Sequence, residues 1–132
     1  MSPFEKTITV GADDLDELKH VNNIRYLEWV QDISRAHWLN TVDQKNKEEL
    51  IWVVRRHDIT YYDSAILGDT IHIATQVIAW KGPISVRQVT MKNNKSGKNL
   101  VMATTEWCAL DAKTRRPVRV PKEIQRLFIK DE

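Results

Sequence analysis

The chain has 132 residues, of which 42% are hydrophobic and 29% charged, a balance that excludes wholesale disorder and fits one globular domain over residues 1–132. The formal net charge of +2 argues against nucleic acid as a partner. No apolar run is long enough for a membrane helix, no signal-like segment begins the chain, and the single cysteine, Cys108, excludes an intrachain disulfide. We therefore expect a cytoplasmic protein with no membrane partner.

The first half of the chain predicts one short strand and one long helix. Residues 6–11 alternate and are rich in β-branched side chains, which is typical of a strand. From Ile24 to Trp38, apolar side chains recur at three- and four-residue steps, which predicts a helix over about residues 22–39. Asn22 or Asn23 is expected to cap its start. The polar residues 42–49 indicate a solvated loop or a short helical turn.

The second half changes to the two-residue period of strands. Strands are predicted over residues 51–62, 70–80, 84–92 and 99–111, with a short helix from Pro121 to about Ile129. Short turns between strands favour antiparallel neighbours. One long helix with an antiparallel sheet of about five strands makes an α+β domain. Because the last strand is apolar or small on both faces, we expect its outer face to meet another subunit.

The most informative segment runs from Asp14 to Trp29. Carboxylates and His20 lie just before a helix start, where backbone N–H groups are unpaired and carry partial positive charge. A carbonyl oxygen placed there would be polarised, and a neighbouring carboxylate can attack the carbonyl or activate water. The same residues also fit a purely structural interpretation, because acidic loops before helices are common. In that interpretation Asp14 and Asp16 solvate a loop, and the asparagines only cap a helix.

The pattern Asp-x-Asp-x-x-x-His-Val-Asn-Asn-x-x-Tyr-x-x-Trp over residues 14–29 resembles the signature of hotdog-fold acyl thioesterases. It is similar both to the 4-hydroxybenzoyl-CoA thioesterase group and to plant acyl-ACP thioesterases. Tyr61-Tyr62, followed after five residues by Gly68-Asp69, resembles the same family. The resemblance implies a hotdog fold, in which the sheet wraps around the long central helix. It also implies hydrolysis of an acyl-CoA or acyl-ACP to free acid and thiol, with no metal or other cofactor.

The resemblance also assigns roles within this segment. The second aspartate of the Asp-x-Asp pair, Asp16, matches the catalytic carboxylate of the bacterial CoA enzymes and would act as nucleophile or general base. The backbone N–H of Asn23 would polarise the thioester carbonyl. His20 matches a histidine implicated in the acyl-ACP enzymes and would position water or Asp16, or simply pack. Leu18 stands where those enzymes have an asparagine, and this departure favours the CoA-type arrangement.

Four further residues are predicted to bind substrate. Tyr26 and Trp29, on the long helix, are expected to help close the acyl tunnel together with a facing subunit, so that a homodimer or homotetramer is expected. Lys81 follows the tryptophan that ends a strand and matches a basic position that meets nucleotide phosphates in the bacterial enzymes. Gly82 and Pro83 replace further basic residues there, and Arg87 is the nearby substitute.

Two other functions are compatible with the fold. A non-catalytic hotdog module would bind acyl chains or a partner protein and would not need Asp16. A hydratase or dehydratase would use a histidine-centred loop pattern that the sequence lacks. Among the remaining polar residues, His57 has no metal-like spacing to other ligands. Arg55 and Arg56 are neighbours in a strand, so that one side chain is expected to point inward.

Overall fold

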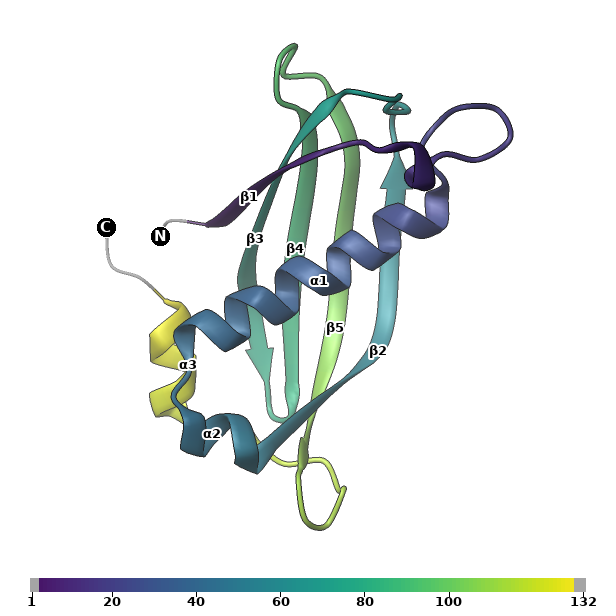
Figure 1. Cartoon of the computed structure of the whole chain (residues 1–132). Helices are drawn as coiled ribbons and strands as arrows, with labels where there is room; N and C mark the ends of the chain where they lie inside the picture. Colours follow the sequence, from purple (N-terminus) through teal and green to yellow (C-terminus); the bar gives the residue numbers. More distant parts are fainter. Residues whose placement is uncertain (1–2, 130–132) are drawn as a thin grey trace.

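The computed structural model describes residues 3–129 and contains one five-stranded antiparallel sheet with α1 lying across one face (Figure 1). The sheet order is β1-β3-β4-β5-β2. The elements are β1 (Phe4–Thr9), the 3-10 turn η1 (Ala12–Asp14), α1 (Asn23–Thr41), α2 (Gln44–Glu49), β2 (Leu50–Tyr61), β3 (Thr70–Lys81), β4 (Ile84–Asn93), β5 (Asn99–Asp111) and α3 (Lys122–Phe128). The α+β prediction is confirmed. No helix within residues 3–129 is both long and apolar enough to cross a membrane.

Helix α1 packs against the sheet with the face that carries Tyr26. Buried residues of α1 follow it at three- and four-residue steps: Val30, Ile33, Ser34 and His37. Ile24, which the sequence places on the apolar face, is instead 66% exposed. It lies two residues before Tyr26, and a 100° rotation per residue turns it to nearly the opposite side of the helix. The periodicity was therefore correct from Tyr26 onward and wrong in the first turn.

Two apolar clusters fill the space between α1 and the sheet. The first lies under the N-terminal half of α1 and includes Tyr26, Val30, Ile71 and Met91. The second lies at the other end, where α3 packs, and includes Leu50, Val77, Ile124 and Phe128, with three tryptophans at its margin: Trp38, Trp52 and Trp80. The two clusters differ in composition: the first is mostly aliphatic, with Tyr26 inside it and Trp29 packed against it, whereas the second is rich in aromatic side chains.

The structure decides two local predictions, one for residues 42–49 and one for the two arginines of β2. Residues 44–49 form the short helix α2, whose N-cap Asp43 accepts a hydrogen bond from Asn46 N–H at 3.0 Å. The inward arginine expected in β2 is absent from the structure. The register of β2 against β5 shifts between Val54 and Arg56, and both Arg55 and Arg56 are exposed, with their nearest acid at Glu106. A bulge adds one residue to the strand and so resets the alternation of side chains.

The sheet has two unpaired edges, β1 and β2. β1 has only 6 residues, whereas β2 has 12. β2 runs antiparallel to α1. The last residue of β2, Tyr61, lies near the start of the helix, and its hydroxyl donates a hydrogen bond to the carbonyl of Asn23 at 3.4 Å. Its first residue, Leu50, belongs to the cluster at the opposite end of the helix. The long edge of the sheet is thus aligned end to end with α1.

Candidate active site

The segment between η1 and α1 forms a loop that projects beside the start of α1 (Figure 1), and Asp16 belongs to this segment. Its Oδ1 accepts hydrogen bonds from the backbone N–H groups of Leu18 at 2.9 Å and His20 at 3.3 Å. Its own N–H donates to the carbonyl of His20 at 2.8 Å, and Lys19 adopts a left-handed φ of 63° to close the turn. Oδ2 accepts no hydrogen bond within residues 3–129. One oxygen of the carboxylate is therefore held in place and the other is open.

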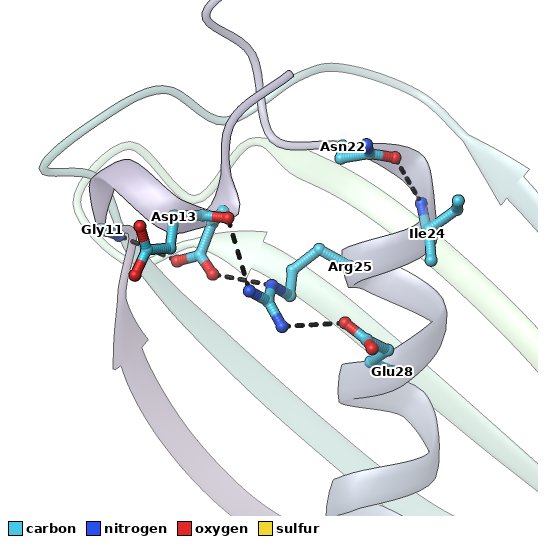
Figure 2. Close-up of polar contacts among 7 residues, drawn as sticks. Gly11, Asp13, Asn22, Ile24, Arg25 and Glu28 are labelled. Carbon is cyan, nitrogen blue, oxygen red and sulfur yellow. Dashed lines mark hydrogen bonds and ion pairs between the residues drawn. The ribbon is translucent and has the colours of Figure 1, made fainter.

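The start of α1 presents the second predicted element, a free backbone donor. Asn22 is the N-cap, and its side-chain oxygen accepts from Ile24 N–H at 3.0 Å (Figure 2). Arg25 N–H donates to the Asn22 carbonyl at 2.8 Å. In the described part of the chain, the N–H of Asn23 has no acceptor, as expected for the first residue of a helix. Asn23 is exposed, so this donor and the positive end of the helix are accessible.

Arg25 ties the helix start to η1, a role that the sequence did not suggest. Its Nε lies 2.7 Å from Asp14 Oδ1, its Nη1 donates to Glu28 at 2.8 Å, and its Nη2 donates to the carbonyl of Asp13 at 3.4 Å (Figure 2). Asp14 also accepts from Gly11 N–H at 2.8 Å. The first aspartate of the Asp-x-Asp pair is therefore structural. Only the spacing of Arg25 and Glu28 could have indicated part of this network.

Tyr26 lies in the core and Trp29 at its margin. Tyr26 is 1% exposed, and its hydroxyl accepts a hydrogen bond from Ala65 N–H at 2.9 Å. Burial, and then the charges of Asp63 and Asp69, raise the pKa of Tyr26, while the Ala65 hydrogen bond opposes them. Trp29 is half-buried and packs edge-on against Tyr26, with ring centroids 5.6 Å apart. Tyr26 thus anchors the helix, and Trp29 is the more accessible of the two.

His20 is exposed at the end of the Asp16 loop and pairs through its backbone with Ile66. No side-chain hydrogen bond of His20 is present within residues 3–129. Its ring is close enough to Asp63 to act on it electrostatically. The Lys98 hydrogen bond, the Ser64 N–H and the Lys98 charge lower the pKa of Asp63, and His20 adds a smaller effect in the same direction. Asp16, His20 and Asn23 are therefore brought together at one loop–helix junction.

Lys81 and Arg87 lie elsewhere in the chain. Lys81 is exposed at the end of β3. The segment before β3 pairs with the Asp16 loop, so Lys81 lies about 36 Å further along the strand. Arg87 is only 6% exposed and contacts His37 and Thr75 in the interior, so it is not a surface residue in this structure. Neither residue meets Asp16 within one chain.

No group of three or more His, Cys, Asp or Glu side chains within residues 3–129 is arranged to hold a metal ion. Two cavities, of about 220 and 390 Å³, are lined by residues other than Asp16, His20 and Asn23. The junction belongs to neither of these two cavities.

Residues 2–128 match the family described as the acyl-ACP thioesterase N-terminal domain. The chain belongs to this acyl-ACP thioesterase family. The match covers nearly the whole sequence, including the Asp16 loop, and confirms the thioesterase resemblance on the segment that predicted it. Membership concerns the domain: the chain spans about a fifth of the length of the plant proteins that it matches.

Relatives of the acyl-ACP thioesterase domain include plant and bacterial proteins. The chain is 35% identical over 84 residues to the acyl-[acyl-carrier-protein] hydrolase FATB3 of Cuphea viscosissima, covering 63% of this chain and 20% of that protein. It is 26% identical over 127 residues to the long-chain acyl-CoA thioesterase FadM of Escherichia coli, covering 92% and 94%. The crystal structure of YbaW, a probable thioesterase from Escherichia coli, superposes with a TM-score of 0.84 at 24% identity, covering 96% and 98%. This likeness confirms the hotdog fold.

Proposed function

We propose that the protein hydrolyses an acyl thioester, carried on CoA or ACP, to the free acid and the thiol. The observation that carries this proposal is the arrangement of Asp16 and Asn23. A carboxylate with one anchored oxygen and one open oxygen lies in the loop that leads into a helix with a free first N–H. Relatives named as hydrolases of acyl-ACP and of acyl-CoA support both carriers.

In the proposed chemistry, the thioester carbonyl accepts the Asn23 N–H at the positive end of α1. Attack on the carbonyl carbon creates an oxyanion, which the N–H and the helix dipole stabilise more strongly than the ground-state carbonyl. Either Asp16 attacks, forming an acyl anhydride that water then opens, or Asp16 takes a proton from the attacking water. In both routes the carbon–sulfur bond breaks, the thiolate leaves and acquires a proton, and Asp16 ends as a carboxylate.

We further propose that two copies pair through β2. An unpaired strand of 12 residues presents a long row of free backbone groups at the sheet edge, which a second copy can satisfy. Exposed apolar side chains surround the candidate site and would gain from cover by a partner: Leu18, Ile24, Tyr61 and Ile66. A two-fold axis through β2 would place Lys81 of one copy at the same end of the double sheet as the Asp16 loop of the other. That arrangement keeps Lys81 as the proposed phosphate contact.

The test compares Asp16→Asn with Glu17→Gln. The asparagine retains an oxygen for the Leu18 and His20 N–H groups, so the loop should stay folded, but the anion is lost. We expect turnover to fall by about a hundredfold or more, with little change in melting temperature. Glu17 is exposed in the same loop, and Glu17→Gln should leave turnover unchanged. Near-normal turnover of Asp16→Asn would overturn the mechanism, whereas binding of acyl thioesters without thiol release by the unmodified protein would favour a non-catalytic module.

A further inference from the structure

The turn between β3 and β4 carries one cation, Lys81, at the position where the sequence comparison expects several. Lys81 ends β3 and is exposed, and Gly82 and Pro83 follow it. Gly82 has a φ of 59°, and a Cβ atom at this position would meet no heavy atom within 4 Å. The surface beside Lys81 is therefore open. A single exposed lysine, however, binds a phosphate group only weakly.

The segment between β5 and α3 lies directly against this turn. Val120 N–H donates a hydrogen bond to the Gly82 carbonyl at 3.1 Å. Next to the turn, Trp80 packs against Phe128 of α3, with ring centroids 6.0 Å apart. Figure 1 shows the β3–β4 turn and the segment after β5 at the same end of the sheet, away from the loop between η1 and α1. A main-chain bond and a ring contact thus hold this segment beside Lys81.

This segment carries a strong excess of positive charge. Residues 112–129 contain six cations and one carboxylate, Glu123. Because the whole chain has a net charge of +2 and this segment one of +5, the remainder has −3. All six cations are exposed: Lys113, Arg115, Arg116, Arg119, Lys122 and Arg126. Within residues 3–129 none of the six takes part in an ion pair. The segment is therefore an anion-attracting surface without an internal counter-charge.

Arg119 and Lys122 are the cations of this segment that flank Val120, the residue bonded to the turn. Following the chain from Arg119 to the Val120 nitrogen, across the hydrogen bond and back to Lys81, the two Cα atoms are at most about 12 Å apart. Lys122 follows Arg119 by three residues, at the start of α3. Long side chains at these positions can meet at one anionic group above the open surface of Gly82.

We propose that Lys81, Arg119 and Lys122 form one binding site for a phosphate group of the acyl carrier. The segment after β5 would then supply the charge that Gly82 and Pro83 do not. CoA and the phosphopantetheine arm of ACP share a phosphate next to the pantetheine, so this group is the chemistry common to both carriers. The inference rests on the proposed thioesterase function and on pairing through β2, which would place this end of one copy beside the partner's Asp16.

Two other features support an exposed phosphate site. The cavity of about 390 Å³ at this end of the sheet is bordered by Arg119, but Glu48, Glu49 and Asp111 also line it. Three carboxylates make its interior unfavourable for an anion, whereas the outer surface has only Glu123 close by in sequence. No aromatic residue lies between positions 112 and 127, so the segment offers no platform for stacking a base. The segment is suited to charge recognition.

The experiment compares thioesters of one acyl group with CoA, with 4′-phosphopantetheine and with pantetheine. Arg119→Gln and Lys122→Gln should each lower kcat/KM for acyl-CoA by about twofold to fivefold, the range for exposed charge pairs. Reversing both charges, with Arg119→Glu and Lys122→Glu together, should lower it by at least about tenfold. The loss should be in KM with kcat unchanged, because the phosphate contact is the same before and during the reaction.

Two controls isolate the phosphate. The pantetheine thioester has no phosphate, so its kcat/KM should be the same in the double variant and the unmodified protein. Lys6→Glu reverses a charge that is exposed on β1, at the edge of the sheet opposite β2, and should change no substrate. Equal losses for acyl-phosphopantetheine and acyl-CoA assign the site to the shared phosphate, and a loss for acyl-CoA alone assigns it to the phosphates of the nucleotide.

A hybrid dimer tests whether the site serves the other subunit. One chain carries Asp16→Asn and the other carries Arg119→Glu with Lys122→Glu, and two affinity tags separate the hybrid. If the site acts across the two-fold axis, one intact Asp16 faces one intact cation cluster, and kcat/KM should be about half that of the unmodified dimer. Action within one chain would instead leave the hybrid as impaired as the double variant and would contradict the proposed arrangement.

Calorimetric binding of CoA to Asp16→Asn, with and without the two charge reversals, measures the site independently of hydrolysis. Weaker CoA binding after charge reversal would support the site even if the protein hydrolyses no thioester. Unchanged kcat/KM and unchanged CoA affinity in the folded double variant would overturn the inference while leaving the thioesterase proposal intact. An equal loss with the pantetheine thioester would also overturn it, as would a loss confined to acyl-ACP, which would assign the cations to the surface of the carrier protein.

Discussion

The hydroxyl of Tyr26 accepts a hydrogen bond from the backbone N–H of Ala65 at 2.9 Å, and the carbonyl of the same Ala65 accepts from Val21 N–H at 2.9 Å. Ala65 is fully buried. Its two hydrogen bonds join Tyr26, in the first turn of α1, to Val21, which lies just before the helix. The position of the Asn23 N–H relative to the sheet depends on this junction.

Tyr26→Phe should destabilise the protein because it leaves the Ala65 N–H buried without an acceptor. We expect a loss of about 1–3 kcal/mol in the free energy of unfolding, measured by urea denaturation. Tyr62→Phe is the matched control, since Tyr62 is 57% exposed, and should change stability by no more than about 0.5 kcal/mol. Equal stability of the two variants would show that the Tyr26 hydroxyl contributes nothing.

The contribution of Tyr26 should also depend on pH. Burial raises the pKa of Tyr26 above its ordinary value of 10.0. The unfolded chain then loses this proton at lower pH than the folded chain, so the stabilisation is complete below pH 10 and falls as pH rises through the folded-state pKa. The stability difference between the unmodified protein and Tyr26→Phe should therefore shrink in urea titrations above about pH 10. A difference that grows with pH would contradict the sign.

Asn23→Pro should remove the oxyanion donor without breaking the helix. Asn23 is the first residue of α1, where proline is accepted, and Asn22 before it is extended at φ −63° and ψ 133°, as a residue before proline prefers. We expect turnover to fall by about tenfold to a thousandfold. Asn23→Ala keeps the N–H, and because Asn22 is the cap, it should be nearly silent. Equal losses in both folded variants would assign the effect to the side chain.

Arg25→Gln should loosen the helix start from η1. The Arg25–Asp14 pair is partly shielded, with Asp14 18% exposed, so we expect a loss of up to about 1 kcal/mol in stability together with reduced turnover. Glu28→Gln disrupts only the more exposed partner, which is 54% exposed, and should have a smaller effect on both measurements. A larger effect of Glu28→Gln would contradict the assigned hierarchy.

Pairing through β2 predicts a pattern of amide hydrogen exchange. The backbone N–H groups of β2 that do not bond to β5 should be protected at concentrations where light scattering gives a dimer, and should lose protection on dilution. The outer N–H groups of β1 provide the internal control and should exchange rapidly throughout. Fast exchange along the outer edge of β2 in a species of dimer mass would point instead to the outer face of β5, where Met102 is 40% exposed.

The sequence predicted those features that depend on local periodicity. The strand over residues 99–111 was correct at both ends, and the start of the long helix was correct to one residue, because side-chain alternation and an asparagine cap are local signals. The bulge at Arg55 was not predictable, since a bulge depends on the partner strand. Asp16, His20 and Asn23 could be placed together because one short segment contains them.

The environment of Arg87 could not be predicted, because the residues that surround it are far away in the sequence. Its hydrogen-bond partner His37 is 50 residues away, and the indoles that share its cavity come from two other strands. Arg87 was expected at the phosphates because it is the basic residue near Lys81 in the sequence, where Gly82 and Pro83 replace the further basic residues of the resembled enzymes. Only the tertiary arrangement places Arg87 beside His37 and Thr75 in the interior.

The turn of the Asp16 loop does not depend on the side chain at its tip, Leu18. Its turn is made by main-chain bonds to Asp16 and by the left-handed Lys19, while the Leu18 side chain is 71% exposed. Leu18 occupies the position where the resembled acyl-ACP enzymes have an asparagine. Because the Leu18 side chain is exposed within the single chain, Leu18→Asn should leave the backbone of this loop unchanged. The identity of residue 18 can thus vary while the Asp16 carboxylate stays where it is.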